Sequence, residues 1–253
     1  MKIIPTQSLD LDGIFSELQS SASYSIKGLD INIIVMEHLK KLNLAKSTSK
    51  NKMFPRTDKF SVSQSSYDCY RKIYFEMQYP RQADDSKIGT FTMGDIIDSI
   101  MKGAFETVGA VTDVGCGKGY FDSKFRIQGS SDIDFSDLII EVKSVSPFAW
   151  KYIVGGKDKL GGVIVGQPKI QHVRQLNTYM DIKNVKDGVL VYVNKDNFQL
   201  KPYPVKYSAD LMIQTVGRCA TVYRSILEKR VPVKVKGDEC SYCNHADLCK
   251  RYP

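Results

Sequence analysis

The sequence contains no apolar run of the roughly 18 residues that a membrane-spanning helix needs. Its first ten residues, MKIIPTQSLD, also lack the basic and then apolar layout of a secretory signal. No tract is collagen-like or repetitive, and 42% hydrophobic with 25% charged residues is ordinary for a folded chain. These absences predict a globular, intracellular protein, cytoplasmic and with no membrane partner.

Without an export signal, a framework of disulfide bonds is not expected, although the chain holds six cysteines. Cysteines in such a chain bind metals or lie buried as thiols. Three of them form a compact group near the end of the chain, in CSYCNHADLC, with Cys240, Cys243 and Cys249 spaced as C-x2-C-x5-C. Cys116 and Cys219 stand alone and are predicted to be ordinary buried or half-buried thiols.

The chain has fewer acidic than basic residues. Lysine and arginine number 36 against 28 aspartates and glutamates, which gives a net charge of +8 and a pI near 9.0. A basic surface favours polyanionic partners, because binding releases counterions condensed on the polyanion. DNA or another nucleic acid is therefore a candidate partner, although a basic surface with no bound partner fits the charge as well.

A chain of 253 residues can build one elaborated domain but hardly two catalytic ones. Residues 1–60 are predicted to form a helical segment, clearest from Ile31 to Leu44, followed by a polar, basic loop that Pro55 interrupts. Residues 61–239 would form the main core. Residues 240–253 would form a cysteine-rich end.

Two helices are expected early in the core. The first is predicted to be capped by Ser63 and to end before Pro80, with Cys69 inside it. The second would run from Thr92 to Val108. Its apolar residues recur at helical spacing and are expected to share one face; they are Ile96, Ile97, Ile100, Met101 and Phe105.

Two strands are expected next, from Lys124 to Phe135 and from Leu138 to Ser144, joined by a tight turn at residues 136–137. In the second strand a period of two places Leu138, Ile140 and Val142 on one side, and Ile139, Glu141 and Lys143 on the other. Two charged residues thus share one face.

The remainder alternates between helices and strands. Residues 144–167 hold the only tryptophan, Trp150, and are expected to form a long loop with a short helix. A helix from Lys169 to Ile182, two strands, GVLVYV and FQLKPYPV, and a helix from Ser208 to Lys229 should follow. This order predicts an α/β fold with a mixed central sheet flanked by helices.

The clearest chemistry lies on the two predicted strands. Asp132 precedes the pattern E-x-K at Glu141 and Lys143. Two carboxylates on adjacent strands can hold a hard divalent ion such as Mg²⁺ or Mn²⁺, and a lysine beside them can offset charge that builds on a phosphoryl group. A solvated hairpin face is the alternative reading, and Asp134 is a second candidate for the first carboxylate.

The cysteine-rich end suggests a metal site of another kind. Three thiolates at this spacing can bind iron in a cluster or a zinc ion, and the spacing does not separate the two. His245 lies between the last two cysteines and could replace one thiolate at zinc.

The segment GSSDIDFSDLIIEVKS resembles the core of RecB-type nucleases in the PD-(D/E)XK superfamily, which include the AddB nuclease domain and CRISPR-associated iron-sulfur exonucleases. The resemblance runs in order from Ser61 to Cys249. It includes an S-x5-C-x-RK segment ending at Lys72, a helix led by Gly94, the acidic core, QLNTY from Gln175 to Tyr179, and the cysteine cluster.

The resemblance implies a restriction-endonuclease-like core and a metal-dependent DNA exonuclease. In such an enzyme Asp132 and Glu141 would bind Mg²⁺ or Mn²⁺, Lys143 would act on the attacking water, and Gln175 and Tyr179 would position DNA. The family usually has a histidine four residues after the helix glycine; Asp98 stands there and is the candidate third metal ligand.

The resemblance also implies a structural [4Fe-4S] cluster, in which Cys69 joins the three cysteines at the end, with Zn²⁺ as the alternative. The partner would be DNA, single-stranded or with free ends, in recombination, repair, phage DNA processing or CRISPR-type adaptation, with helicase or adaptation partners. The alternative function is a noncatalytic DNA-binding or assembly protein that keeps the fold. Phe148 and Trp150 could separate strands by stacking on bases, or simply pack together.

Overall fold

A computed structural model describes the core of the chain and short pieces before it. The described residues are 25–26, 29–30, 41, 55, 59–79, 88–107, 113–114, 120–158, 160–235, 237, 240–241 and 243–252. The predicted entry helix, most of the basic loop and Cys116 lie outside these ranges. The early pieces include an antiparallel pair, β1 (Ser25–Ile26) and β2 (Leu29–Asp30).

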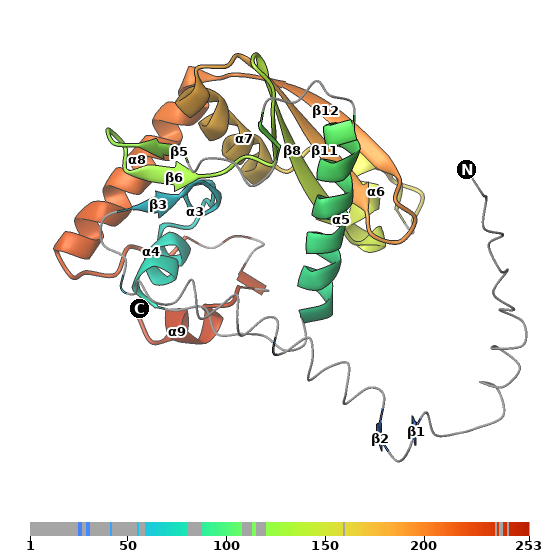
Figure 1. Cartoon of the computed structure of the whole chain (residues 1–253). Helices are drawn as coiled ribbons and strands as arrows, with labels where there is room; N and C mark the ends of the chain where they lie inside the picture. The colour runs from blue at the N-terminus through green and yellow to red at the C-terminus, as the bar shows by residue number, and fades with distance from the viewer. Residues whose placement is uncertain are drawn as a thin grey trace, which may run out of the picture.

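A five-stranded sheet forms the centre of the molecule (Figure 1). Its order is β12 (Leu200–Lys206), β11 (Asp187–Asn194), β8 (Leu138–Val145), β7 (Ile133–Asp134) and β4 (Asp113–Val114). The β8 and β11 strands run parallel, whereas the other neighbours are antiparallel. The predicted mixed α/β fold is therefore confirmed.

Helices cover both faces of this sheet (Figure 1). The face of β8 that bears Ile140 and Val142 packs with Ile97 and Met101 of α5 (Ile88–Thr107). Ile139, on the opposite face, belongs to the main core with the residues of α7 (Ile170–Lys183) and α8 (Ala209–Leu227). The predicted alternation along β8 is confirmed, because neighbouring residues of a strand point to opposite faces.

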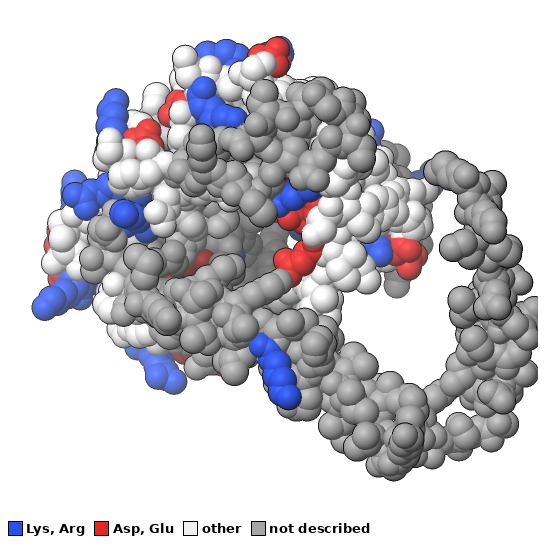
Figure 2. Space-filling view, viewed as in Figure 1, with Lys and Arg blue, Asp and Glu red and all other residues white. Residues whose placement is uncertain are grey.

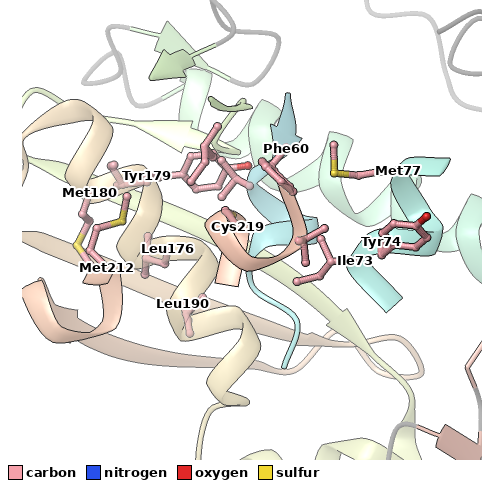
Figure 3. Packing of buried hydrophobic residues seen from close by; sticks show 14 of the residues in the cluster. Phe60, Ile73, Tyr74, Met77, Leu176, Tyr179, Met180, Leu190, Met212 and Cys219 are labelled. Carbon is pink, nitrogen blue, oxygen red and sulfur yellow. The ribbon is translucent and has the colours of Figure 1, made fainter. Parts of the chain in front are cut away.

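The main core lies between the sheet, α7, α8 and α4 (Tyr70–Gln78). Figure 3 shows how Leu176 and Met180 of α7 lie near Leu190 of β11 and Met212 of α8. Cys219, also shown, is 3% exposed, so its reading as a buried thiol is confirmed. Burial raises the pKa of the Cys219 thiol to about 12.

The predicted strand from Lys124 to Phe135 is wrong in its extent, because the structure divides it. Residues 123–126 form a turn in which Arg126 has a left-handed φ of 56°. After the turn β6 (Ile127–Gly129) joins a separate three-stranded sheet with β3 (Phe60–Ser61) and β5 (Tyr120–Asp122). The chain then enters the central sheet as β7. Residues 127–134 thus form two strands in two different sheets, and the alternation of apolar residues does not reveal where one strand ends and the next begins.

The predicted helix capped by Ser63 is likewise two helices. Ser61 caps α3 (Val62–Ser65), and its side chain and that of Gln64 bond to each other's backbone N–H. After a short break Cys69 is the N-cap residue of α4 and makes no side-chain capping bond. Cys69 therefore lies at a helix start with its thiol uncommitted to the cap, and not inside a helix.

The helix α5 begins at Ile88, before the predicted Thr92, and its apolar residues do not share one face. Ile97 and Met101 are buried, with Phe105 packed beside them, whereas Ile96 and Ile100 are 47% and 51% exposed. The error arose because adjacent isoleucines on a helix point about 100° apart.

The segment after β8 contains α6 (Pro147–Val154) and a hairpin of β9 (Gly156–Lys157) and β10 (Val163–Ile164), so the short helix expected there is present. The helices predicted from Lys169 and from Ser208 are confirmed as α7 and α8, with Ser208 as the N-cap of α8. The last helix is α9 (Ala246–Lys250). Within the described part of the chain, no helix is both long and apolar enough to span a membrane.

Candidate active site

Asp132 and Glu141 face each other at the start of β7. The antiparallel register pairs Ile133 with Ile140, so Asp132 stands opposite Glu141 one position further. The backbone N–H of Val142 donates to Asp132 Oδ2 at 2.8 Å and fixes this carboxylate against β8. The structure therefore brings together the two carboxylates that the sequence singled out.

Glu141 is 2% exposed, and its two carboxylate oxygens differ in their hydrogen bonds. Oε1 accepts hydrogen bonds from Lys143 Nζ at 2.6 Å and from Gln175 Nε2 at 2.7 Å. Oε2 is buried and accepts no hydrogen bond from the described residues. Burial raises the pKa of Glu141 to about 8, and the nearby Asp132 adds to the effect while Lys143 opposes it.

Burial also raises the pKa of Asp132, although Lys143 and the Val142 N–H act against the rise. Burial alone would lower the pKa of Lys143, but the charges of Glu141 and Asp132 outweigh it and raise that pKa. The lysine therefore stays protonated, and its side chain, 22% exposed, reaches the surface of the site. A cation held beside two hard-to-ionise carboxylates is an arrangement suited to charge stabilisation.

Gln175 and Tyr179 lie one helical turn apart on α7 and both face the site. Gln175 bonds Glu141 directly. Burial raises the pKa of the Tyr179 hydroxyl, as does the charge of Glu141, while a hydrogen bond with Gln175 opposes them. Gly129 makes room for the tyrosine, because a Cβ there would lie 3.1 Å from the Tyr179 hydroxyl and 2.9 Å from Val62.

Asp98 lies close enough to act on the site through its charge, which raises the pKa of both Asp132 and Glu141. Its own Oδ2 accepts from Lys102 Nζ at 2.5 Å, one turn further along α5. The helix approaches the sheet closely at Gly94, where a Cβ would lie 3.4 Å from Ser144 Oγ. Asp98 thus lies near the two carboxylates, but its own carboxylate forms an ion pair with Lys102.

Asp134, the second candidate for the first carboxylate, has other partners. Ser131 Oγ donates to its Oδ1 at 2.5 Å, and Lys183 of α7 forms an ion pair with its Oδ2 at 2.9 Å. Asp134 is therefore engaged in a contact between β7 and α7, and Asp132 is the aspartate that faces Glu141.

One residue of the site region, Tyr192, was not predicted from the sequence, whereas His172, which precedes QLNTY, was a candidate phosphate contact. Tyr192 of β11 is fully buried, and its hydroxyl lies 2.9 Å from His172 Nδ1 while it accepts from the Lys169 N–H. Burial lowers the pKa of His172 to about 3, and Lys143 and Lys169 lower it further. His172 lies three residues before Gln175 on the same helix face. For Tyr192 the sequence offered no signal beyond an apolar strand.

Of the four candidate cluster cysteines, Cys69 and Cys240 lie close enough to Cys243 to act on it through their charge, and Cys249 contacts Arg71 in the first turn of α4. Burial raises the pKa of Cys243, and the neighbouring thiols of Cys69 and Cys240 act in the same direction. Arg71, two residues after Cys69, donates to Cys249 Sγ at 3.6 Å. Residues far apart in sequence are thus gathered at one place, as Figure 1 also shows for α4 and α9.

Neither the acidic residues of the site nor the cysteines near α4 form a closed set of metal ligands. Among the described residues, no three histidine, cysteine, aspartate or glutamate side chains stand close enough together to hold a metal ion as they are placed. The acidic site nevertheless fits a divalent cation, because Glu141 Oε2 lacks a hydrogen bond and Mg²⁺ needs only one or two carboxylates when water and phosphate complete its shell. Figure 2 shows aspartate and glutamate at the edge of a hollow in this face.

The fold and the site together define a mixed α/β protein with two carboxylates and a lysine at the junction of adjacent strands. No family model matches the sequence, and a search of curated proteins finds no match. Among solved structures, the protein SSO0001 is 20% identical with a TM-score of 0.58, covering 87% of this chain and 98% of its own. The likeness shows a shared fold.

Two other solved structures are more distant. An alkaline exonuclease from Laribacter hongkongensis is 16% identical with a TM-score of 0.44, over 69% of this chain and 90% of its own. A phage-related exonuclease from Haemophilus somnus 129PT is 10% identical with a TM-score of 0.44, over 63% of this chain and 81% of its own. At such TM-scores the chemistry must be argued from the site itself.

Proposed function

We propose that this protein is a metal-dependent DNA nuclease of the PD-(D/E)XK class that hydrolyses phosphodiester bonds. The observation that carries the proposal is the burial and hydrogen bonding of the Glu141 carboxylate. One of its oxygens is held by Lys143 and Gln175, and the other is buried, unbonded and beside Asp132. A buried carboxylate oxygen without a partner is costly, and a cation at that point would satisfy it.

The residues would divide the work as follows. Asp132 and Glu141 would hold Mg²⁺ or Mn²⁺, with Asp98 as a further ligand if it leaves Lys102. When bound, the ion supplies a Lewis acid for the phosphoryl group and lowers the pKa of the attacking water. Lys143 stays protonated and would orient that water or offset charge on the phosphoryl oxygens.

Gln175 holds Glu141 in place through its amide, so it would act as a positioning residue whose second contact is to Tyr179. The surplus of positive charge, +8, would favour the approach of DNA. Among DNA substrates we propose single strands or free ends, with exonuclease action in recombination, repair, phage DNA processing or CRISPR-type adaptation.

The test is digestion of end-labelled single- and double-stranded DNA by anaerobically purified protein with Mg²⁺, Mn²⁺ or EDTA. Lys143→Ala should lower the cutting rate by roughly 100- to 1,000-fold, the usual cost of losing one positioned electrostatic group. Lys206→Ala is the matched control, because Lys206 also pairs with a carboxylate, Asp187, but is 81% exposed on β12.

Two outcomes are informative. Cutting that needs the metal and is lost in Lys143→Ala, but kept in Lys206→Ala, supports the nuclease, and the labelled products show its polarity. Tight DNA binding with no cutting under any metal would instead indicate a noncatalytic DNA-binding protein that keeps the fold.

We also propose that Cys69, Cys240, Cys243 and Cys249 hold a structural [4Fe-4S] cluster. The support is that Cys69 has no capping bond at the start of α4, that Cys69 and Cys240 act on Cys243 through their charge, and that Cys249 contacts Arg71 two residues after Cys69. Thiolates are the ligands that such clusters take. Zinc is the alternative, since four cysteines also form a closed tetrahedral zinc site.

Iron, acid-labile sulfide and zinc are to be measured in anaerobically purified protein. We expect about four irons and four sulfides per chain, and their loss in Cys243→Ser. Cys219→Ser is the control, because Cys219 is a buried cysteine of α8 that is not among the four candidate ligands. One zinc per chain, lost in the same variant, would contradict the cluster.

A further inference from the structure

The helix α6 presents an aromatic surface to solvent. Phe148 is 71% exposed and Tyr152 is 45% exposed, one helical turn apart. Their ring centroids are 5.8 Å apart in an edge-to-face arrangement. Lys151 lies between them, with its Nζ 4.7 Å from the Phe148 ring centre and 4.8 Å from that of Tyr152. We refer to Phe148, Lys151 and Tyr152 as the α6 patch.

Folding does not explain the α6 patch. The side chains that attach α6 to the core are those of Ile153, which is 1% exposed, and Trp150, which packs against the main core. Phe148 and Trp150, which the sequence suggested as residues that stack on bases or pack together, thus have different surroundings. Large apolar side chains that remain exposed beside a cation are typical of a binding surface.

A pocket adjoins the patch. It has a volume of about 440 Å³ and lies between α6 and the start of α7, where Tyr152 forms part of its wall together with Pro168, Lys169 and Ile170. The Lys169 N–H is held by the buried hydroxyl of Tyr192, so this wall is anchored to the sheet. The surface beside Tyr152 is therefore hollowed, partly apolar and edged by a second lysine.

The patch lies close to the candidate active site along the chain. The helix α6 begins directly after β8, with Ser146 as its N-cap and Pro147 in its first turn. Phe148 lies five positions after Lys143, so their Cα atoms can be at most roughly 18 Å apart. A strand with its phosphate at Lys143 could therefore place a nearby base on α6.

We propose that the α6 patch is a stacking site for an unpaired base of single-stranded DNA. The inference rests on the proposed function for its choice of DNA as the polymer. An unpaired base offers a flat π-face to Phe148 or Tyr152, and Lys151 and Lys169 can meet the adjoining phosphates. Bases inside a duplex are covered by their neighbours, so the site selects single strands or frayed ends.

The experiment measures binding of a fluorescein-labelled oligothymidylate to full-length protein in EDTA, where no cutting can occur. Phe148→Ala and Tyr152→Ala should each weaken binding by about 5- to 160-fold, the effect of about 1–3 kcal/mol per stacked base. Tyr152→Phe keeps the ring and should bind like wild type. Phe121→Ala is the matched control, because Phe121 is also an exposed phenylalanine, 50% exposed, with Lys59 over its ring at 5.1 Å.

A second readout reports the stacking itself. An oligonucleotide with a single 2-aminopurine, moved one position at a time, should lose fluorescence at one position with wild type and keep it with Phe148→Ala. Unchanged affinity in both alanine variants, or an equal loss in Phe121→Ala, overturns the proposal. So does equal weakening of blunt duplex binding by Phe148→Ala.

The two proposals can fail separately. A protein that cuts DNA while Phe148→Ala binds single strands normally would lack the stacking site but remain a nuclease. A protein that never cuts, but whose single-strand binding depends on Phe148 and Tyr152, would keep the stacking site without the nuclease.

Discussion

His172 is held as a neutral ring by a chain of hydrogen bonds. Tyr192 accepts from the Lys169 N–H, and among the described residues its own proton has His172 Nδ1 as a hydrogen-bond partner, at 2.9 Å. Because Tyr192 is fully buried, its proton is best satisfied by donation to Nδ1, which leaves the histidine proton on Nε2. His172 is therefore a neutral donor on the same face of α7 as Gln175.

This histidine should make the protein sensitive to acid. The pKa of His172 is lowered to about 3 in the folded chain and lies near 6.5 when unfolded. Between these values the unfolded state binds more protons, so stability is present above pH 6.5 and is lost as pH falls toward 3. We expect wild type to lose about 3 kcal/mol from this group between pH 7 and pH 4.

Denaturant unfolding at the two pH values provides the measurement, with His172→Gln as the comparison. The variant should be less stable at pH 7 but should lose less stability on acidification than wild type does. Equal pH dependence in the two proteins would show that the His172 ring takes up protons as easily folded as unfolded.

At the scale of single residues, the sequence predicted Asp132, Glu141, Lys143, Gln175 and Tyr179, and the structure gathers all five. The pattern on the two strands indicated Glu141, Lys143 and one of two aspartates, and the family resemblance added Gln175 and Tyr179. The partners of Asp134 could not be predicted, because its ion pair with Lys183 joins elements that only the folded chain brings together.

The ion pair between Asp134 and Lys183 fastens β7 to α7, the two elements that carry Asp132 and Gln175. Asp134 is 3% exposed, and Ser131 also bonds it. Removing one partner of a buried ion pair is far more costly than the loss of a surface pair.

Lys183→Met should therefore lower the free energy of unfolding by about 3 kcal/mol, measured by urea denaturation. Lys206→Met, which removes an exposed lysine from its pair with Asp187, should change it by about 0.5 kcal/mol or less. Similar small losses in both variants would mean that Asp134 finds other compensation. We also expect Lys183→Met to slow DNA cutting, since Asp132 would be less firmly placed.

At the scale of elements, prediction succeeded where one periodicity ran unbroken. The strand β8 and the helices α7 and α8 have clear periods of two or 3.6 residues, with Ser208 as a cap signal. Prediction failed at α3 and α4, because Ser61 rather than Ser63 forms the capping box and the chain breaks before Cys69. Two short helices in series have nearly the same pattern as one long helix.

Arg71 joins the two ends of the described core. It is 3% exposed, and its guanidinium donates to the carbonyl oxygens of Pro232 at 2.9 Å, Cys249 at 3.4 Å and Tyr252 at 2.9 Å. These acceptors are 161, 178 and 181 residues away in sequence. One side chain thus ties α4 to the last part of the chain, beside the candidate cluster cysteines.

Arg71→Met should release that segment while α4 itself remains folded. We expect trypsin to cleave near Lys234 and Lys250 much faster than in wild type, and the free energy of unfolding to fall by about 3 kcal/mol. Arg230→Met is the control, because Arg230 is 78% exposed and pairs with Glu228 near the same segment. Equal digestion of the two variants would indicate that packing alone holds the segment.

At the scale of the whole molecule, the sequence predicted a mixed sheet with helices on both faces, and this is confirmed. It did not predict that β8 and β11 pair in parallel, with Glu141 beside Leu190 and Lys143 beside Tyr192. Such pairing depends on how α6 and α7 return the chain, which is a matter of long-range contacts rather than local pattern. The division of 1–60, 61–239 and 240–253 stays a prediction.

The reach of Arg71 also sets an order of events during synthesis. A ribosome that adds about 5–20 residues per second needs roughly 10 to 35 seconds to extend the chain from Arg71 to Tyr252. For most of that interval, until Pro232 is added, none of the three carbonyl acceptors has been made, so the guanidinium cannot yet tie α4 to the last part of the chain. Any group that joins Cys69 to the other three cysteines can likewise bind only after nearly the whole chain has been made.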